Sequence, residues 1–170
     1  RVCSLRTPTL PPATHTNCYL LGGAEFVLVD PASPYEDEQA ALDGVLAGEL
    51  ARGRKLREIW LTHHHLDHIG AAQHLLPPLH FPPCYGTKLT MAFVRKRLDE
   101  EKLTSKAQLH TVQFREKIRI GRVDVEFLHM THSIPDSAAI AVHTPYGTIV
   151  HTGDFKFDLT PMNEPPADFS

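Results

Sequence analysis

Four histidines within six residues form the strongest chemical signal in this sequence. The segment Thr62–Gly70 reads THHHLDHIG and follows a short apolar stretch. Imidazole is a preferred ligand of zinc and of related divalent ions. Because side chains alternate along an extended chain, His63 and His65 point the same way and are expected to bind one ion. Asp67 and His68 lie beyond the bend of the chain and are expected to face a second ion. The alternatives are a solvated polar loop and an artificial His tag.

Two further segments place metal-ligand side chains directly after predicted strands. His132 stands where the strand 123–130 gives way to a loop, a common place for a ligand. It could complete a set of three imidazoles with His63 and His65. Asp154 follows a strand and a glycine that lets the backbone approach closely, so its carboxylate could bridge two cations. A hydrogen-bonded loop histidine and a turn aspartate are the structural alternatives.

Several polar residues beside these motifs are expected to support the ligands. Asp30 ends an apolar strand and could hold the histidine segment by hydrogen bonds, or could be a plain strand-ending aspartate. His151 could orient a ligand or could be a satisfied histidine of a strand. Ser133 and Ser137 could donate hydrogen bonds to a phosphate, or could cap their own loop. Alternation turns His64 away from its neighbours, so we expect that it does not bind metal.

The predicted elements place these residues at strand ends. Ser33 and Pro34 predict the start of a helix that runs to about Arg52, and Gly121-Arg122 is the predicted turn of a hairpin. Because helices separate groups of strands, the order favours an α/β fold with helices on the outer faces of sheets. The expected helices are 33–52, 70–76 and 87–103, and 161–170 is expected to be a loop. The expected strands are 17–21, 25–30, 59–61, 82–85 (at a sheet edge), 109–114, 117–120, 123–130, 138–144 and 148–152.

The composition fits one globular domain over residues 1–170. Hydrophobic residues make up 42% of the chain and charged residues 22%, which argues against disorder and fibrous repeats. No apolar run reaches the ~18–20 residues of a membrane span, so no membrane is expected. Three cysteines without a Cys-x-x-Cys pair favour a reducing compartment, and we expect a cytoplasmic location. The missing Met at position 1 suggests a trimmed start.

The order of these motifs resembles the metallo-β-lactamase superfamily. Its metal-binding pattern is matched by the His-x-His-x-Asp-His run, then by a histidine and then by an aspartate, each after a predicted strand. The resemblance covers most of the chain and implies an αββα sandwich with two metal ions at one edge of the sheets. It also implies that one ion is bound by His63, His65 and His132, and the other by Asp67 and His68, with Asp154 as the bridge.

Within the superfamily, residues 85–161 look like ribonuclease J. The likeness rests on Tyr85–Thr90, Thr131–Ser137 and His151–Asp158. Ribonuclease J also has an inserted β-CASP domain, and nothing further along this chain resembles it or supplies the superfamily's last histidine ligand. Residues 14–76 look more like small stand-alone hydrolases of the superfamily. We therefore expect a metallo-β-lactamase-like domain that is incomplete at its C-terminus, either a fragment or a hybrid.

The expected function is metal-dependent hydrolysis, with RNA phosphodiester cleavage of the ribonuclease J type as the first hypothesis. Two Zn2+ ions are expected, with Mn2+ as the alternative where carboxylate and water complete a site. Asp67 is the expected catalytic residue, holding the proton of the attacking water. The alternatives are a small-molecule hydrolase acting on a thioester, lactone or β-lactam, and an inactive metal-binding scaffold. The net charge of −3 favours these alternatives, since RNA binding usually requires a basic surface. A homodimer is left open.

Overall fold

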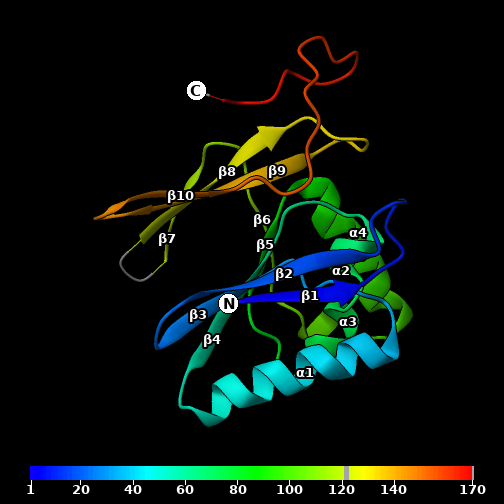
Figure 1. Cartoon of the computed structure of the whole chain (residues 1–170), viewed down its shortest axis with the longest axis vertical. Helices are drawn as coiled ribbons and strands as arrows, with labels where there is room; N and C mark the ends of the chain where they lie inside the picture. The colour runs from blue at the N-terminus through cyan, green and yellow to red at the C-terminus, as the bar shows by residue number, and fades with distance from the viewer. Residues whose placement is uncertain (121–122, 170) are drawn as a thin grey trace.

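Strands that are apolar on both faces form the middle of the fold. In β3 (Glu25–Val29) and β4 (Lys55–Leu61), alternate side chains point to opposite faces of the sheet. Phe26, Leu28, Ile59 and Leu61 pack against helices, whereas Val27, Val29 and Trp60 pack against a second sheet. The computed structural model describes residues 1–120 and 123–169 and has three layers in this order: helices, first sheet, second sheet (Figure 1).

The first sheet has six strands in the order β1-β2-β3-β4-β5-β6. The pairs β1–β2 and β2–β3 are antiparallel, and the pairs from β3 to β6 are parallel. The carboxyl ends of β3 and β4 therefore meet at one edge of the sheet, where Asp30 and the histidine segment follow them. The other strands of this sheet are β1 (Val2–Arg6), β2 (His15–Gly22), β5 (Cys84–Gly86) and β6 (Leu109–Thr111).

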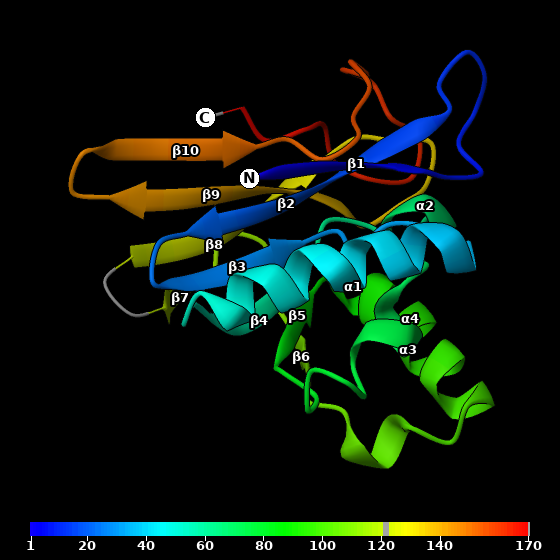
Figure 2. The same ribbon diagram turned by 60° about the horizontal axis from the view of Figure 1, so that its bottom comes forward.

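Helices cover the face of the first sheet that is turned away from the second sheet (Figure 2). Helix α1 (Glu36–Ala51) contributes Leu42 and Leu46 to this core, and α4 (Lys88–Glu100) contributes Met91, Val94 and Leu98. Two four-residue helices, α2 (Leu66–Ile69) and α3 (Ala72–Leu75), follow the histidine segment. A short 3-10 helix spans Thr104–Lys106. No helix in the described ranges is long and apolar enough to cross a membrane.

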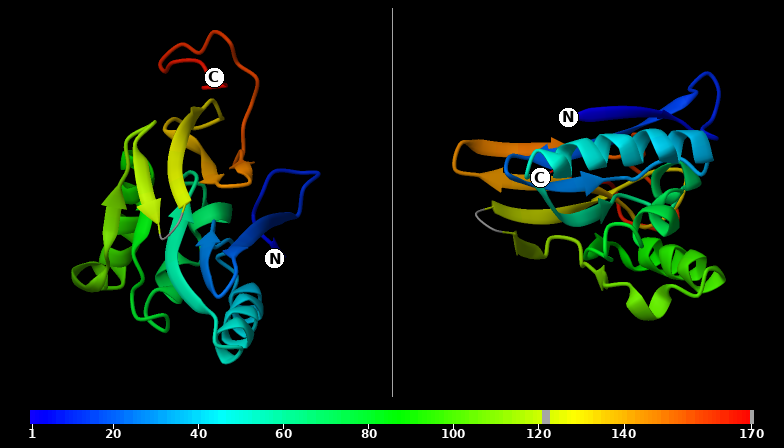
Figure 3. Two further views of the ribbon diagram at one scale, coloured as in Figure 1. Left: turned by 90° about the vertical axis from the view of Figure 1, so that its left-hand side faces the viewer. Right: turned by 90° about the horizontal axis from the view of Figure 1, so that it is seen from below.

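The second sheet is antiparallel, in the order β10-β9-β8-β7. Its strands are β7 (Lys117–Ile120), β8 (Val123–Met130), β9 (Ser137–Thr144) and β10 (Gly147–His151). Its inner face adds Val125, Phe127, Ala138 and Ile140 to the core between the sheets. Its outer side carries the segment after β10 (Figure 3), tied down by a hydrogen bond from the Asp168 N–H to the carbonyl of His129 (2.8 Å). The expected α/β sandwich is confirmed. Within the described residues, its outer layer of helices lies on the first sheet.

Several elements differ from their predicted bounds or places. Helix α1 begins at Glu36, because the Ser33 hydroxyl donates to the carbonyl of Arg6 (2.8 Å) and Ser33 has a φ of 78°. The strand predicted at an edge is wrong in position: β5 pairs with strands on both sides. Strand β1 was not predicted, and the hairpin turn predicted at Gly121-Arg122 lies outside the described residues.

Candidate metal centre

The predicted ligands gather at one end of the two sheets. His63 and His65 follow β4, and Asp67 and His68 belong to α2, which begins one residue later. The strands β8 and β10 both pair antiparallel with β9, so they run in the same direction. Their carboxyl ends deliver His132 and Asp154 to the same place as the histidine segment. Side chains from both sheets therefore meet at this end of the molecule.

The first group consists of three imidazoles. One ring nitrogen of each of His63, His65 and His132 lies within 4.8 Å of those of the other two. The nitrogen His63 Nε2 is 3.1 Å from His65 Nδ1, and His132 Nε2 is 3.2 Å from the same atom. His63 is fully buried, while the other two are half-buried. Three converging imidazole nitrogens are a donor set that suits zinc.

Hydrogen bonds beneath this group fix the tautomers of the histidines. Asp30 is fully buried; its Oδ1 accepts from the Thr62 N–H (2.8 Å) and its Oδ2 from the Thr62 hydroxyl (2.7 Å). Because that hydroxyl proton is directed to Asp30, His63 Nδ1 must donate to the Thr62 oxygen (3.0 Å). The lone pair of His63 Nε2 is then free for a cation. In the same way, His68 Nδ1 donates to Asp30 Oδ2 (3.0 Å), which directs His68 Nε2 toward the centre.

The second group combines His63, His68 and Asp154, whose ligand atoms also lie within 4.8 Å of one another. His68 Nε2 is buried and has no hydrogen-bond partner among the described residues, although Asp154 Oδ2 lies 3.5 Å away. Asp67 lies at the rim of this group, with its Oδ2 4.0 Å from His68 Nε2. A buried nitrogen without a partner is costly unless a ligand satisfies it. The donor set therefore fits a second divalent cation.

The charges of these residues also favour cations. Burial lowers the pKa of His63 to about 3, helped by the neighbouring His68, so the His63 ring is neutral at pH 7. Burial also lowers the pKa of His65 and of His132. For His68 the effect of burial is outweighed by the Asp30 and Asp154 carboxylates, which raise its pKa to about 10. The close approach of His68, whose Nε2 lies 3.5 Å away, lowers the pKa of Asp154 to about 2. A position that holds a proton so tightly between two carboxylates attracts positive charge.

Backbone contacts between the sheets hold the ligand loops in place. The Gly153 backbone has a φ of 60°, and a Cβ added there would lie 3.0 Å from the carbonyl oxygen of Ala138 and from Thr62 Cβ. Only glycine allows the loop before Asp154 to approach the first sheet so closely. The Lys156 N–H donates to the Thr131 carbonyl (2.8 Å), and the Thr131 hydroxyl donates back to the Lys156 carbonyl (2.7 Å). These bonds keep Asp154 beside the loop of His132.

Three other residues singled out by the sequence lie around the centre. His151 lies beside Asp30, with its Nε2 3.6 Å from Asp30 Oδ2, and its ring contacts Tyr19. Ser133 is exposed, with its hydroxyl 3.5 Å from His132 Nε2. Ser137 is buried and donates to the carbonyl of Ile134 (3.2 Å), so it caps its own loop and is not available to a phosphate.

His64 points away from both groups. Its ring stacks on Phe93 of α4, with the centroids 4.3 Å apart, and it shares neither set of ligand atoms. This is the direction that alternation along the chain predicts.

One residue that orients Asp67 was missed by the sequence interpretation. The Thr16 hydroxyl donates to Asp67 Oδ2 (3.1 Å), and the Thr7 hydroxyl lies 2.9 Å from the Thr16 oxygen. Since Thr16 directs its proton to the carboxylate, Thr7 must donate to Thr16. Thr16 occupies an inward position of β2, so in the sequence it is indistinguishable from a packed strand threonine.

A pocket of about 270 Å³ opens beside the second group. Its walls include Thr16, Tyr19, His68, His151 and Asp154. Another cavity, of about 710 Å³, lies between the sheets and is lined by Gly22, Trp60, Ile120 and Val142, none of which belongs to the histidine centre. The smaller pocket therefore borders the second group through His68 and Asp154.

Known proteins share this pattern. The family model described as the metallo-beta-lactamase superfamily matches residues 11–169. A ribonuclease J of Synechocystis sp. is 43% identical over 110 residues, which cover 64% of this chain and 17% of that protein. Ribonuclease J 2 of Staphylococcus aureus is 40% identical over 126 residues, covering 72% of this chain and 22% of that protein. The chain thus spans about a fifth of the length of these relatives.

Solved structures share the fold. The metallo-beta-lactamase fold protein YhfI of Bacillus subtilis superposes with a TM-score of 0.64 at 21% identity, over 92% of this chain and 63% of that one. The predicted resemblance to the superfamily, and to ribonuclease J within it, is confirmed. The likeness of residues 14–76 to stand-alone hydrolases stays a prediction. With the family model covering nearly all of it, the chain belongs to the metallo-β-lactamase superfamily.

Proposed function

We propose that this chain hydrolyses phosphodiester bonds of RNA at a centre of two divalent cations. One observation carries the proposal: two overlapping donor sets, His63/His65/His132 and His63/His68/Asp154, converge at one end of the sheets. The membership in a superfamily of metal-dependent hydrolases and the ribonuclease J relatives support it. Because those relatives are much longer, RNA as the substrate and a cytoplasmic site of action are parts of the proposal.

The residues present fit Zn2+ better than Mg2+ or Ca2+. Five of the six proposed ligands belong to the two groups that share His63, and four of the six are imidazoles: His63, His65, Asp67, His68, His132 and Asp154. Zinc suits the three-imidazole group, and Mn2+ is the alternative where a carboxylate and water complete the second group. When bound, such ions activate water for attack and offset the charge that develops on the phosphoryl group.

The side chains of the chain have separate tasks in this proposal. The Asp67 carboxylate, oriented by Thr16, accepts the proton of the attacking water. Asp30 holds the rings of His63 and His68 in one tautomer, directly or through Thr62, and stays ionised as it does so. The carboxylate of Asp154 is half-exposed, so it faces both the second group and the pocket by which a substrate enters.

The test is a substrate panel with the metal-loaded chain. We expect cleavage of a single-stranded RNA in the presence of Zn2+ or Mn2+, loss of cleavage with a chelator, and recovery when metal is restored. A thioester, a lactone and a chromogenic β-lactam are assayed under the same conditions. Hydrolysis of one of these compounds without cleavage of RNA would refute the RNA proposal and leave a metal-dependent hydrolase.

A small-molecule hydrolase is the second candidate, and the size of the pocket favours it. At about 270 Å³ the pocket beside His68 and Asp154 is close to the lower limit of ordinary ligand sites, about 300 Å³, so it suits a short acyl group. If metal binds stoichiometrically and no substrate of the panel is turned over, the inactive scaffold becomes the better description.

A further inference from the structure

Helix α4 carries exposed cations without acidic partners. From Lys88 to Leu98 the sequence has four basic residues and no acidic one, although the whole chain has a net charge of −3. Lys88, Arg95 and Lys96 are exposed, and within the described ranges they make no ion pair. Several cations elsewhere are neutralised locally, as in the pairs Arg54–Glu49, Arg57–Glu25 and Lys156–Asp158. Positive charge is therefore concentrated on the part of α4 that precedes its two acidic residues, Asp99 and Glu100.

These cations line a groove between α4 and the edge strand β6. The groove has a volume of about 290 Å³, and Lys88, Arg95 and Lys96 lie along it with Met91, Leu109 and Thr111 among its other lining residues. Lys88 and Arg95 are seven residues apart, which is about 10 Å along a helix, so the charges form a row. Asp99 lies at the far end and is engaged by the hydroxyl of Thr104. The groove thus offers a line of cations above a partly apolar floor.

The groove begins beside the metal centre. At the start of α4, the Leu89 N–H donates to Asp136 Oδ2 (2.6 Å) and the Thr87 hydroxyl donates to the Asp136 carbonyl (2.7 Å). Asp136 belongs to the loop that carries His132. Further along the helix, Phe93 stacks on His64 of the histidine segment. Helix α4 therefore touches both ligand loops, and its cations lead away from them.

We propose that this groove binds the phosphodiester backbone of single-stranded RNA whose scissile bond lies at the metal centre. The inference rests on the proposed function and extends it to the path of the substrate. Lys and Arg side chains bind phosphates by releasing counterions, and such contacts position a strand without reading its sequence. The local excess of cations also answers the objection that the net charge of the chain is negative. Binding in the groove is accordingly independent of base sequence and sensitive to salt.

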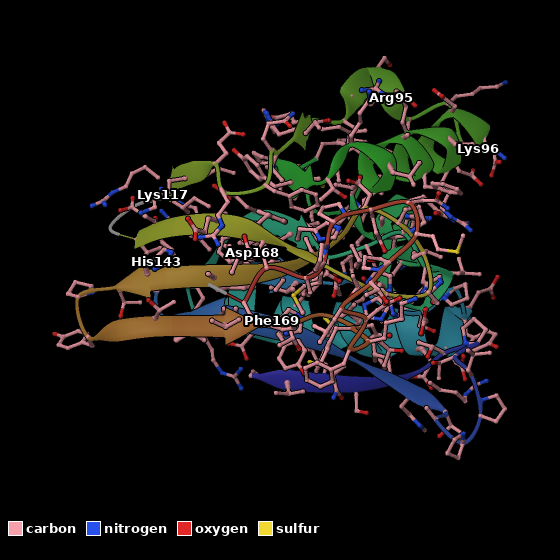
Figure 4. The ribbon with its side chains drawn as sticks, turned by 90° about the horizontal axis from the view of Figure 1, so that it is seen from above. Arg95, Lys96, Lys117, His143, Asp168 and Phe169 are labelled. Atoms are coloured by element: carbon pink, nitrogen blue, oxygen red, sulfur yellow. The ribbon has the colours of Figure 1, made fainter. Side chains whose placement is uncertain are left out.

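The test compares two double variants of equal charge change. Arg95→Gln with Lys96→Gln removes two cations of the groove. Lys55→Gln with Lys117→Gln removes two exposed cations elsewhere; Lys117 lies far from Arg95 and Lys96 in Figure 4. Binding of a labelled 20-nucleotide RNA is measured by fluorescence anisotropy at several salt concentrations, in metal-loaded protein that also carries Asp67→Asn to prevent cleavage. Melting temperatures confirm that all variants are folded.

The groove variant is expected to bind RNA about 25-fold more weakly at 0.1 M salt, since each phosphate contact to a single strand contributes about 0.7 to the slope of log K against log salt. The slope should fall by about 1.4, while the control should bind as the parent does. Equal weakening in both variants, or displacement of RNA by polyglutamate as efficiently as by unlabelled RNA, would overturn the proposal.

Kinetics separate this inference from the proposed function. In chains with Asp67 intact, the groove variant should raise KM for the long RNA and leave kcat unchanged, and a dinucleotide too short to reach the groove should be cleaved normally. Cleavage of long RNA with unchanged KM refutes the groove and leaves the proposed function intact. Conversely, if no RNA is cleaved but the loss of binding is confined to the groove variant, the groove stands and the proposed activity falls.

Discussion

The proton on His68 is placed by a residue that we do not expect to touch metal. Asp30 accepts from His68 Nδ1, and this bond leaves the Nε2 atom for a cation. Asn at position 30 is nearly the same size, but its NH2 group would face the same nitrogen as a donor. The His68 ring would then keep its proton on Nε2, where it blocks a metal ion.

Asp30→Asn is therefore expected to weaken binding of the second ion by about 10–100-fold, the usual effect of changing a group that orients a ligand. Competition with a chromophoric chelator measures both affinities. Asp43→Asn serves as the control, because Asp43 also pairs with a histidine, His74, but on the exposed surface of the molecule. Unchanged affinities in Asp30→Asn would show that the tautomer argument is incorrect.

Asp67 and His64 give a second test within the same six-residue segment. Asp67 faces the second group and is oriented by Thr16, whereas His64 stacks on Phe93. If Asp67 takes the proton of the attacking water, Asp67→Ala should lower kcat by about 100-fold or more, and His64→Ala should change it by less than about tenfold. Both are measured on RNA at saturating metal, so that lost affinity is not mistaken for lost chemistry. A larger effect of His64→Ala would contradict these roles.

Chemical type and alternation predicted, residue by residue, most of the side chains that gather at this end of the sheets; their binding of metal stays a prediction. All six proposed ligands lie at one end of the sheets. What the sequence could not predict is that His63 faces both groups, because α2 turns His68 back beneath it, with the ring centroids 4.0 Å apart. It also could not separate Ser137, which caps a loop, from a phosphate donor, since both uses need only a hydroxyl.

At the scale of elements, replacing glycine by alanine should have opposite effects on stability in the loop before Asp154 and in helix α1. Gly153→Ala should destabilise the chain by about 1–3 kcal/mol, because alanine disfavours the positive φ and its Cβ would crowd Ala138 and Thr62. The same change should weaken binding of the second ion, because it displaces Asp154. Gly44 lies in α1 with nothing within 4 Å of an added Cβ, so Gly44→Ala should stabilise by about 0.5–1 kcal/mol. Urea unfolding measures both; the same sign for the two variants would contradict the argument.

The end of α1 is joined to the first sheet by an acid whose charge depends on pH. Glu49 is buried, and its pKa is lowered first by the hydrogen bond from Arg54 and then by that from Arg1. Arg54 also donates to the carbonyls of Gly22 and Gly23 in the β2–β3 hairpin. A carboxyl group whose pKa is lower in the folded chain stabilises the fold at pH values above its pKa in the unfolded chain, about 4.3. This stabilisation is lost as the pH falls through the pKa that the group has in the folded chain.

Glu49→Gln should therefore melt at a lower temperature than the wild type at pH 7, and the difference should shrink as the pH falls below about 4. Circular dichroism in the presence of a chelator follows the melting without interference from bound metal. Glu100→Gln is the matched control, since Glu100 is exposed and makes no ion pair within the described ranges. A difference between Glu49→Gln and wild type that stays constant with pH would exclude the proposed ion pairs.

Element prediction succeeded where periodicity was strong and failed where tertiary contacts decided. The strands β7 and β8 have the predicted bounds, because alternation and flanking turns define them locally. The place of β5 between β4 and β6 depends on parallel partners far away in the chain, and the two prolines before it, Pro82 and Pro83, suggested an edge. The start of α1 moved because Ser33 bonds to Arg6, a contact that no local pattern contains.

At the scale of the whole molecule, the proposed ions would join the two sheets. His63, His65 and His68 follow the first sheet, whereas His132 and Asp154 follow strands of the second. A bound cation raises the free energy of unfolding when the folded chain binds it more tightly than the unfolded chain does. The ligands from the two sheets are far apart in the sequence, so only the folded chain brings them together. At a metal concentration 100 times Kd this contribution is about 2.7 kcal/mol.

A chelator should accordingly lower the melting temperature by about 5–10 °C, since one kcal/mol corresponds to about 2–4 °C for a chain of this size. The double change His63→Ala, His65→Ala should abolish the shift, because it removes two of the three imidazoles of the first group. His64→Ala should keep the shift, as its ring stacks on Phe93 outside both groups. If the ions link the sheets as proposed, hydrogen exchange should also quicken in β8 and β10 when metal is withdrawn. Melting that is insensitive to the chelator, in protein shown by elemental analysis to contain metal beforehand, would mean that the ions do not hold the sheets together.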